Sequence, residues 1–150
     1  MLKHKLQEDL RQSMLAKDAL RTSVLRMLLS SINYYEIQKG GAGYEATDED
    51  VLSVIQKEVK QRKDSIEQFS RANRQDLVDK ETKESQILQT YLPKQMSEDE
   101  IRRLATNAIQ EAGASSLQDI GKVMGVLMPK VKGKTDGALV SKIVKEYLTR

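Results

Sequence analysis

Hydrophobic residues recur along this chain at intervals of three and four positions, which is the spacing that gathers side chains on one side of an α-helix. No segment alternates hydrophobic and polar residues in the manner of a β-strand. Together with the residues that begin and end helices, the pattern predicts seven helices. We expect the first five at about 2–16, 19–39, 47–69, 75–92 and 97–112, a sixth that begins at Ser116, and a seventh that Asp136 caps. The sequence therefore predicts an all-α fold.

The segment PKQMS at 93–97 is the expected boundary between two domains. A proline disfavours helical backbone in the residue before it, so the fourth helix should stop at Pro93. Ser97 and Glu100 then have the spacing of a capping box, which begins a new helix. We predict an N-terminal helical domain at 1–92 and a small three-helix C-terminal domain at 97–150. The glycine-rich residues 40–46 are expected to form a flexible loop.

One charged residue interrupts the hydrophobic side of the third helix. Arg62 falls in the middle of that side, and Glu81 and Glu84 share the hydrophobic side of the fourth helix. If the two helices form a hairpin that turns near Asn73, Arg62 and Glu84 lie level with each other. Two interpretations are open: a partly buried Arg62–Glu84 ion pair, with Glu81 as a further partner, or an Arg62 side chain that extends to solvent. In both cases the role is structural.

The composition narrows the classes of function. The formal net charge of +3 is too small for a protein that coats nucleic acid, but it leaves room for a local basic contact. The chain has no cysteine, which excludes disulfides, thiolate catalysis and cysteine-bound metals. No hydrophobic run reaches the roughly 20 residues of a membrane span, and the N-terminus lacks the hydrophobic stretch of a signal peptide. We therefore predict a cytoplasmic protein without a membrane partner.

Residues that carry catalysis are scarce. His4 is the only histidine, and its place on a charged helix side near the N-terminus suits an exposed structural residue. The chain has no histidine–carboxylate spacing typical of zinc sites, and no glycine-rich phosphate loop of the GxxxxGK[ST] kind. We predict no catalytic residue, no metal site and no cofactor.

The segment GKVMGVLMPKVKGKTDG at 121–137 differs most from the rest of the chain. It holds four of the eight glycines and four lysines, with no acidic residue before Asp136. Glycine lets a partner approach the backbone, and ammonium groups attract phosphate. Pro129 should end or kink the sixth helix, and Asp136 should cap the seventh. The candidate RNA-binding residues are Lys122, Lys130, Lys132 and Lys134, and the candidate close-approach and loop residues are Gly121, Gly125, Gly133, Asp136 and Gly137.

Composition leaves two other interpretations of this segment open. It also suits a solvent-exposed turn whose lysines bind nothing. The pair Met124 and Met128 belongs more naturally to the core, but with the spacing of Gly121 and Gly125 it also suits a helix that docks against another protein.

Four stretches of the chain resemble the YqeY family. They are AKDALRTSVLRMLLSSI at 16–32, RKDSIEQFSRANRQDLVDKE at 62–81, YLPKQMSEDEI at 91–101, and the 121–137 segment. The resemblance extends over essentially the whole length. The last third is similar to the C-terminal tail domain of GatB, a subunit of the tRNA-dependent amidotransferase. That enzyme converts misacylated Glu-tRNA or Asp-tRNA to Gln-tRNA or Asn-tRNA, with glutamine as the nitrogen donor.

The resemblance implies two helical subdomains, of which the second is a three-helix module like the GatB tail. In GatB the tail helps to hold the tRNA, and the chemistry lies in a different domain that has no counterpart here. We therefore expect a module that binds tRNA or another RNA, acting with a tRNA amidotransferase or another aminoacyl-tRNA enzyme. The alternatives are a protein-interaction module, and a carbon–nitrogen ligase with glutamine as amido-N-donor, which kinship alone implies.

Overall fold

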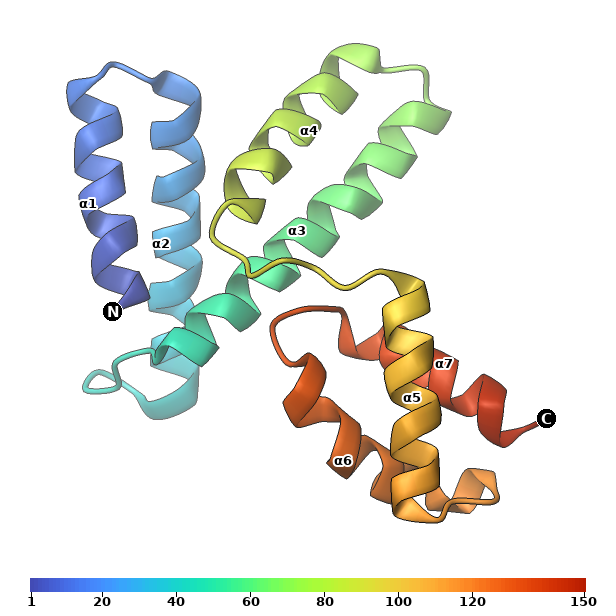
Figure 1. Ribbon diagram of the computed structural model, residues 1–150. Coiled ribbons are helices and arrows are strands. Elements are labelled where there is room, and N and C mark those ends of the chain that lie inside the picture. The colour runs from blue at the N-terminus through green and yellow to red at the C-terminus, as the bar shows by residue number, and fades with distance from the viewer. The chain divides into compact units, whose positions relative to one another are not determined.

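The computed structural model describes residues 1–150, and it is built from helices alone (Figure 1). Seven α-helices and one short 3₁₀ helix follow one another without a β-strand, which confirms the predicted all-α fold. The chain divides into two compact units, Met1–Leu92 and Pro93–Arg150, and each has its own hydrophobic core. None of the helices combines the length and the hydrophobicity that crossing a bilayer requires.

The first unit consists of two helical hairpins (Figure 1). Its helices are α1 (Leu2–Leu15) and α2 (Ala19–Gly40), then α3 (Asp48–Arg71) and α4 (Gln75–Gln89). Asp18 caps α2 by accepting the N–H of Arg21, and Thr47 caps α3 by accepting the N–H of Asp50. The second hairpin turns at Asn73, as predicted, and this residue has a positive φ of 56°.

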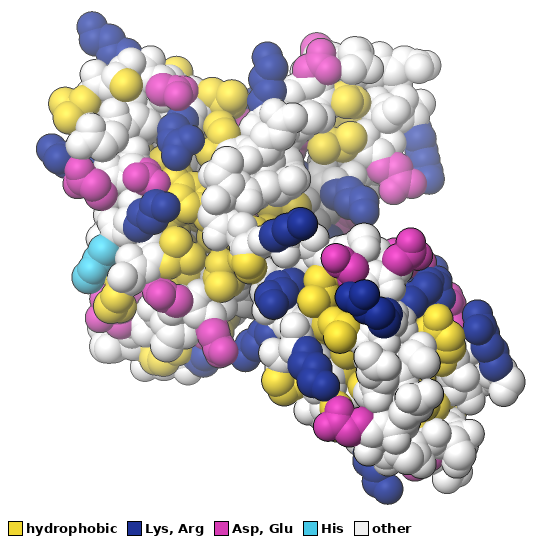
Figure 2. Space-filling model, viewed as in Figure 1, with side chains coloured by type: hydrophobic (Ala, Val, Ile, Leu, Met, Phe, Trp, Pro, Cys, Tyr) yellow, Lys and Arg dark blue, Asp and Glu magenta, His cyan; other side chains and the backbone are white.

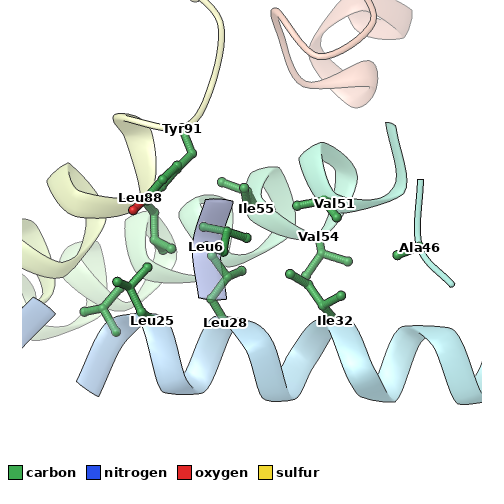
Figure 3. Packing of buried hydrophobic residues seen from close by; sticks show 11 residues of the cluster. Leu6, Leu25, Leu28, Ile32, Ala46, Val51, Val54, Ile55, Leu88 and Tyr91 are labelled. Carbon is green, nitrogen blue, oxygen red and sulfur yellow. The ribbon is translucent and has the colours of Figure 1, made fainter. Parts of the chain in front are cut away.

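Hydrophobic side chains from all four helices fill the core of the first unit (Figure 3). The almost fully buried members are Leu6 of α1, Val24, Leu25, Leu28 and Ile32 of α2, Val51 and Ile55 of α3, and Leu88 of α4. Burying one side chain of this size contributes about 1.5–3 kcal/mol. α2 supplies the largest share, because hydrophobic residues cover more than half of its circumference.

The second half of the loop between α2 and α3 is anchored, contrary to the flexible loop predicted there. Ala46 is buried, and its N–H donates to Glu36 Oε1 at 2.8 Å. Tyr44 OH donates to Asp50 Oδ2 at 2.5 Å. The two carboxylates that hold the loop lie outside the glycine-rich stretch, so its composition alone does not reveal them.

A buried ion cluster joins α3 and α4, and it contains the Arg62–Glu84 pair. Arg62 Nε lies 3.3 Å from Glu84 Oε2, although the Nε–H makes no hydrogen bond of good geometry. Arg62 Nη1 donates to Glu58 Oε2 at 2.8 Å, and Ser31 Oγ of α2 donates to Glu58 Oε1 at 3.0 Å. The further partner of Arg62 is therefore Glu58, one turn earlier on the same helix, and Glu81 takes no part.

The second unit contains three α-helices and the 3₁₀ helix. They are α5 (Glu98–Ala112), η1 (Leu117–Asp119), α6 (Ile120–Val131) and α7 (Gly137–Leu148). Ser97 and Glu100 form the capping box of α5, and Gly113 ends that helix with a left-handed φ of 63°. The core takes Ile101, Ala105 and Ala108 from α5, Val123, Leu127 and Val131 from α6, and Val140, Ile143 and Val144 from α7.

The ends of α4 and α6, each near a proline, differ from the prediction. α4 ends at Gln89, before the predicted end at residue 92, and a turn leads to Pro93. α6 continues past Pro129 to Val131. Val131 is buried in the core, and the N–H of Lys132 donates to the C=O of Met128 at 2.9 Å. The helix therefore resumes its backbone hydrogen bonds after the one that proline removes.

Candidate nucleic-acid interface

One side of α6 is exposed and almost free of side chains. Gly121, Gly125 and Pro129 lie at intervals of four residues and share this side. A Cβ atom added to either glycine would meet no atom within 4 Å. On the opposite side of the helix, Val123 and Leu127 are fully buried. The backbone of α6 is therefore open to a partner along about two helical turns.

Lys122 and Lys130 lie near the two ends of α6 with exposed side chains. Eight residues separate them, which is about 12 Å along the helix axis. Lys130 Nζ lies 3.3 Å from Glu111 Oε2 in an exposed ion pair, and a pair of this kind contributes little to stability. Backbone N–H groups, chiefly that of Ser115, hold the pKa of Asp119 below its usual range, and the charge of Lys122 adds to the effect.

The loop between α6 and α7 carries the exposed side chains of Lys132 and Lys134. Gly133 lies between them and is buried, with a positive φ of 78° that favours glycine. Its C=O accepts a hydrogen bond from Gln95 Nε2 at 3.1 Å. The C=O of Lys134 accepts the N–H of Met96 at 2.9 Å. Gly133 therefore shapes this loop, and residues 95 and 96 cover its backbone.

Asp136 and Gly137 connect this loop to α7. Asp136 Oδ1 accepts the N–H of Ala138 at 3.1 Å and caps the helix. A Cβ atom at Gly137 would lie 3.6 Å from Met128 Cε, which is an ordinary van der Waals contact. Met124 and Met128 are partly buried and pack against the core, as expected for this pair. The bare backbone of the segment is thus confined to α6.

The structure brings the four candidate lysines onto α6 and the adjoining loop, but it does not gather them at one point. Figure 2 shows Lys and Arg side chains spread among hydrophobic side chains over the visible face of the second unit. Cations spaced in this way suit an extended polyanion, which can contact several of them at once, better than a single small anion.

Lys94 and Arg103 were not predicted from the sequence, and they line a hollow of about 350 Å³ together with Lys134. Lys94 belongs to the segment that was predicted only as a domain boundary. Arg103 lies on the exposed side of α5. Each is one exposed cation among many in the sequence, so only the folded structure shows that the three share a hollow.

The most strongly perturbed carboxyl group lies in the first unit and is structural. Asp50 is buried, and it accepts hydrogen bonds from Lys39 Nζ at 2.7 Å and Tyr35 OH at 2.8 Å, besides that from Tyr44 OH. These donors, with Lys39 foremost, hold the pKa of Asp50 far below its usual range. No group of three or more His, Asp or Glu side chains is arranged to hold a metal ion.

The sequence profile of one family, described as Yqey-like protein, matches residues 3–148. The chain belongs to the YqeY family. The match runs through both units, which confirms that the resemblance extends over essentially the whole length.

Several YqeY relatives carry the name "Altered inheritance of mitochondria protein 41, mitochondrial". The protein of this name from Vanderwaltozyma polyspora is 30% identical over 149 residues, which cover 95% of this chain and 80% of the relative. The protein of this name from Pyrenophora tritici-repentis is 34% identical over 151 residues, which cover 96% of this chain and 79% of the relative. That from Saccharomyces cerevisiae is 30% identical over 152 residues, covering 95% and 80%.

The predicted cytoplasmic location is wrong, because these relatives are named mitochondrial proteins. The prediction rested on the absence of a membrane span and of the hydrophobic stretch of a secretory signal. Neither feature distinguishes two aqueous compartments, since mitochondrial targeting uses amphipathic, arginine-rich segments instead.

Proposed function

We propose that this protein binds RNA, with tRNA as the expected class, through α6 and the loop that follows it. The observation that carries the proposal is the bare side of α6, where Gly121 and Gly125 leave the backbone open, with Lys122 beside it and Lys130 near the far end of the helix. An RNA backbone can lie close against such a helix, and the flanking ammonium groups then neutralise its phosphates.

The similarity of the last third of the chain to the GatB tail supports tRNA as the ligand, because that tail holds tRNA in the amidotransferase. We propose that the protein acts beside a tRNA amidotransferase or another aminoacyl-tRNA enzyme, and that carbon–nitrogen ligation belongs to that partner. We extend the proposal to RNA of the mitochondrion, because the relatives are named mitochondrial proteins.

The substitution Gly125→Ala separates folding from binding. The added methyl group meets no atom within 4 Å, and alanine favours a helix over glycine by up to about 1 kcal/mol, so the stability should rise. If RNA lies against this backbone, the same methyl group should weaken tRNA binding about fivefold. Ser30→Ala, at an exposed position of α2, is the matched control and should leave binding unchanged.

The salt dependence of tRNA binding tests the lysines. If Lys122, Lys130, Lys132 and Lys134 each neutralise one phosphate, log K should fall against log salt with a slope of roughly −3 to −4. The Lys122→Ala/Lys130→Ala variant should reduce the slope by about two, while Lys142→Ala on α7 should not reduce it. A double variant that binds tRNA as tightly as the unaltered protein would reject the proposal. Binding without salt dependence, to one protein partner, would replace it with the protein-interaction alternative.

A further inference from the structure

We propose that the hollow beside α5 binds one unpaired nucleotide of single-stranded RNA, with its phosphate held by Lys94, Arg103 and Lys134. This inference rests on the proposed function and goes beyond it, because it adds a second contact and specifies an unpaired part of the RNA. The hollow is lined entirely by residues of the second unit.

The cations around the hollow lack the partners that neighbouring cations have. Arg102 on α5 donates to Glu98 Oε1 at 2.6 Å and to Glu146 Oε2 at 3.1 Å. Arg103, the next residue, lines the hollow and forms no ion pair, and the same holds for Lys94 and Lys134. Unpaired cations are free to bind an anion without first breaking an internal contact.

A single carboxylate faces these three cations. Glu100 also lines the hollow, but its Oε2 accepts the N–H of Ser97 at 2.9 Å as part of the capping box of α5. Its oxygen is therefore directed to the helix start, and the lining keeps an excess of positive charge. Such an excess raises the local concentration of anions and favours a phosphate group.

Two hydrogen bonds fix the walls of the hollow. The N–H of Met96 donates to the C=O of Lys134 at 2.9 Å, and Gln95 Nε2 donates to the C=O of Gly133 at 3.1 Å. They tie the segment before α5 to the loop between α6 and α7, which lie 38 residues apart in sequence. Walls that are fixed in advance reduce the ordering cost of binding.

The rest of the lining is hydrophobic. Pro93, Met96 and Leu104 line the hollow beside the cations, and Met96 and Leu104 are half-buried. Its volume of about 350 Å³ lies near the lower end of the roughly 300–1,000 Å³ of small-molecule sites. A flat base covers such a surface only when it is unstacked, as in single strands, loops and ends of RNA. The lining therefore favours an unpaired nucleotide over duplex RNA.

The test measures the binding of the 150-residue chain to labelled oligouridylate and to an RNA duplex of equal length, by fluorescence anisotropy. We expect Lys94→Ala and Arg103→Ala each to weaken oligouridylate binding about tenfold, while duplex binding changes less than about twofold. Lys142→Ala removes the same charge from an exposed site on α7 and should change both affinities equally little. Inorganic phosphate at equal concentration should not displace the oligouridylate.

The outcomes separate this inference from the proposed function. Suppose that the unaltered protein binds RNA and Lys122→Ala/Lys130→Ala weakens it, but Lys94→Ala and Arg103→Ala behave like Lys142→Ala. The hollow is then not an RNA site, and the function proposed for α6 stands. Equal losses for oligouridylate and duplex, or full displacement by inorganic phosphate, also overturn the inference. If the unaltered protein binds no RNA, both proposals fall.

Discussion

Arg62 Nε lies 3.3 Å from Glu84 Oε2 across the α3–α4 hairpin, and only 7% and 9% of the two side chains are exposed. A buried ion pair adds little net stability, because both charges lose their hydration. Removing one partner is costly, because the other charge then stays buried without compensation. We infer that the pair fixes the alignment of α3 with α4.

Glu84→Ala should lower the free energy of unfolding by about 3 kcal/mol, at the lower end for a broken buried pair. The loss is limited because Glu58 Oε2 still lies 2.8 Å from Arg62. Glu67→Ala breaks an exposed ion pair with Arg71 on the same helix and should cost less than about 1 kcal/mol. Urea unfolding of the 150-residue chain measures both losses of stability, and equal small losses would contradict a buried pair.

Asp50→Asn should destabilise the protein at neutral pH by about 2–3 kcal/mol, since it removes a buried carboxylate with charge-assisted hydrogen bonds. The pKa of Asp50 in the folded protein is lowered, chiefly by Lys39, while an unfolded aspartate has a pKa of about 3.9. The stabilisation is therefore complete above the unfolded pKa and is lost as the pH falls below it.

The difference in stability between Asp50→Asn and the unaltered protein should consequently narrow by about 1 kcal/mol at pH 3. Urea unfolding at pH 7, 5 and 3 measures this difference. A difference in stability that stays constant from pH 7 to pH 3 would show that folding does not lower the pKa of Asp50.

Tyr91→Phe should cost about 1–3 kcal/mol of unfolding free energy. The hydroxyl group donates to Asp9 Oδ2 at 2.6 Å and accepts from Arg21 Nη2 at 3.0 Å, so it ties the residues after α4 to α1 and α2. Phenylalanine leaves these partners without the hydroxyl. Tyr34→Phe is the control, because Tyr34 is 64% exposed, and thermal unfolding should detect no loss there.

Gly133→Ala should lower the free energy of unfolding by about 1–2 kcal/mol. Residue 133 has a φ of 78°, and a residue with a Cβ atom is strained by about that amount in left-handed backbone. Gly121→Ala should raise the stability, because a Cβ at this helical position of α6 meets no atom within 4 Å and alanine favours a helix over glycine. The two midpoints of thermal unfolding should therefore move in opposite directions. A stabilising Gly133→Ala would contradict the loop geometry.

Residues 93–150 should fold without the rest of the chain, because their core uses only side chains of α5, α6 and α7 and residues near them. The isolated fragment should show helical circular dichroism and a cooperative thermal transition. A fragment that melts without cooperativity would contradict the predicted division into two domains. Residues 1–92 provide the companion measurement.

The hydrophobic pattern predicted the helices well, because each helix buries one side. The hydrophobic residues of that side recur every three or four positions, and this spacing is visible within the segment itself. Capping residues predicted where helices begin, since Thr47, Ser97 and Asp136 accept backbone N–H groups two or three residues later. The helix ends were less accurate. α6 passes Pro129 because Val131 is buried, and burial depends on residues elsewhere in the chain.

At the candidate site, too, the sequence predicts some features and only the folded structure shows the others. The sequence by itself determined that lysines and glycines concentrate at 121–137, and their period on α6 predicts which of them share a side. Only the tertiary structure decided that Gly125 is bare while Gly133 is covered. It likewise brought Lys94 and Arg103 to one hollow with Lys134. Contacts between residues tens of positions apart arise from the packing of whole helices, and a local pattern does not encode that packing.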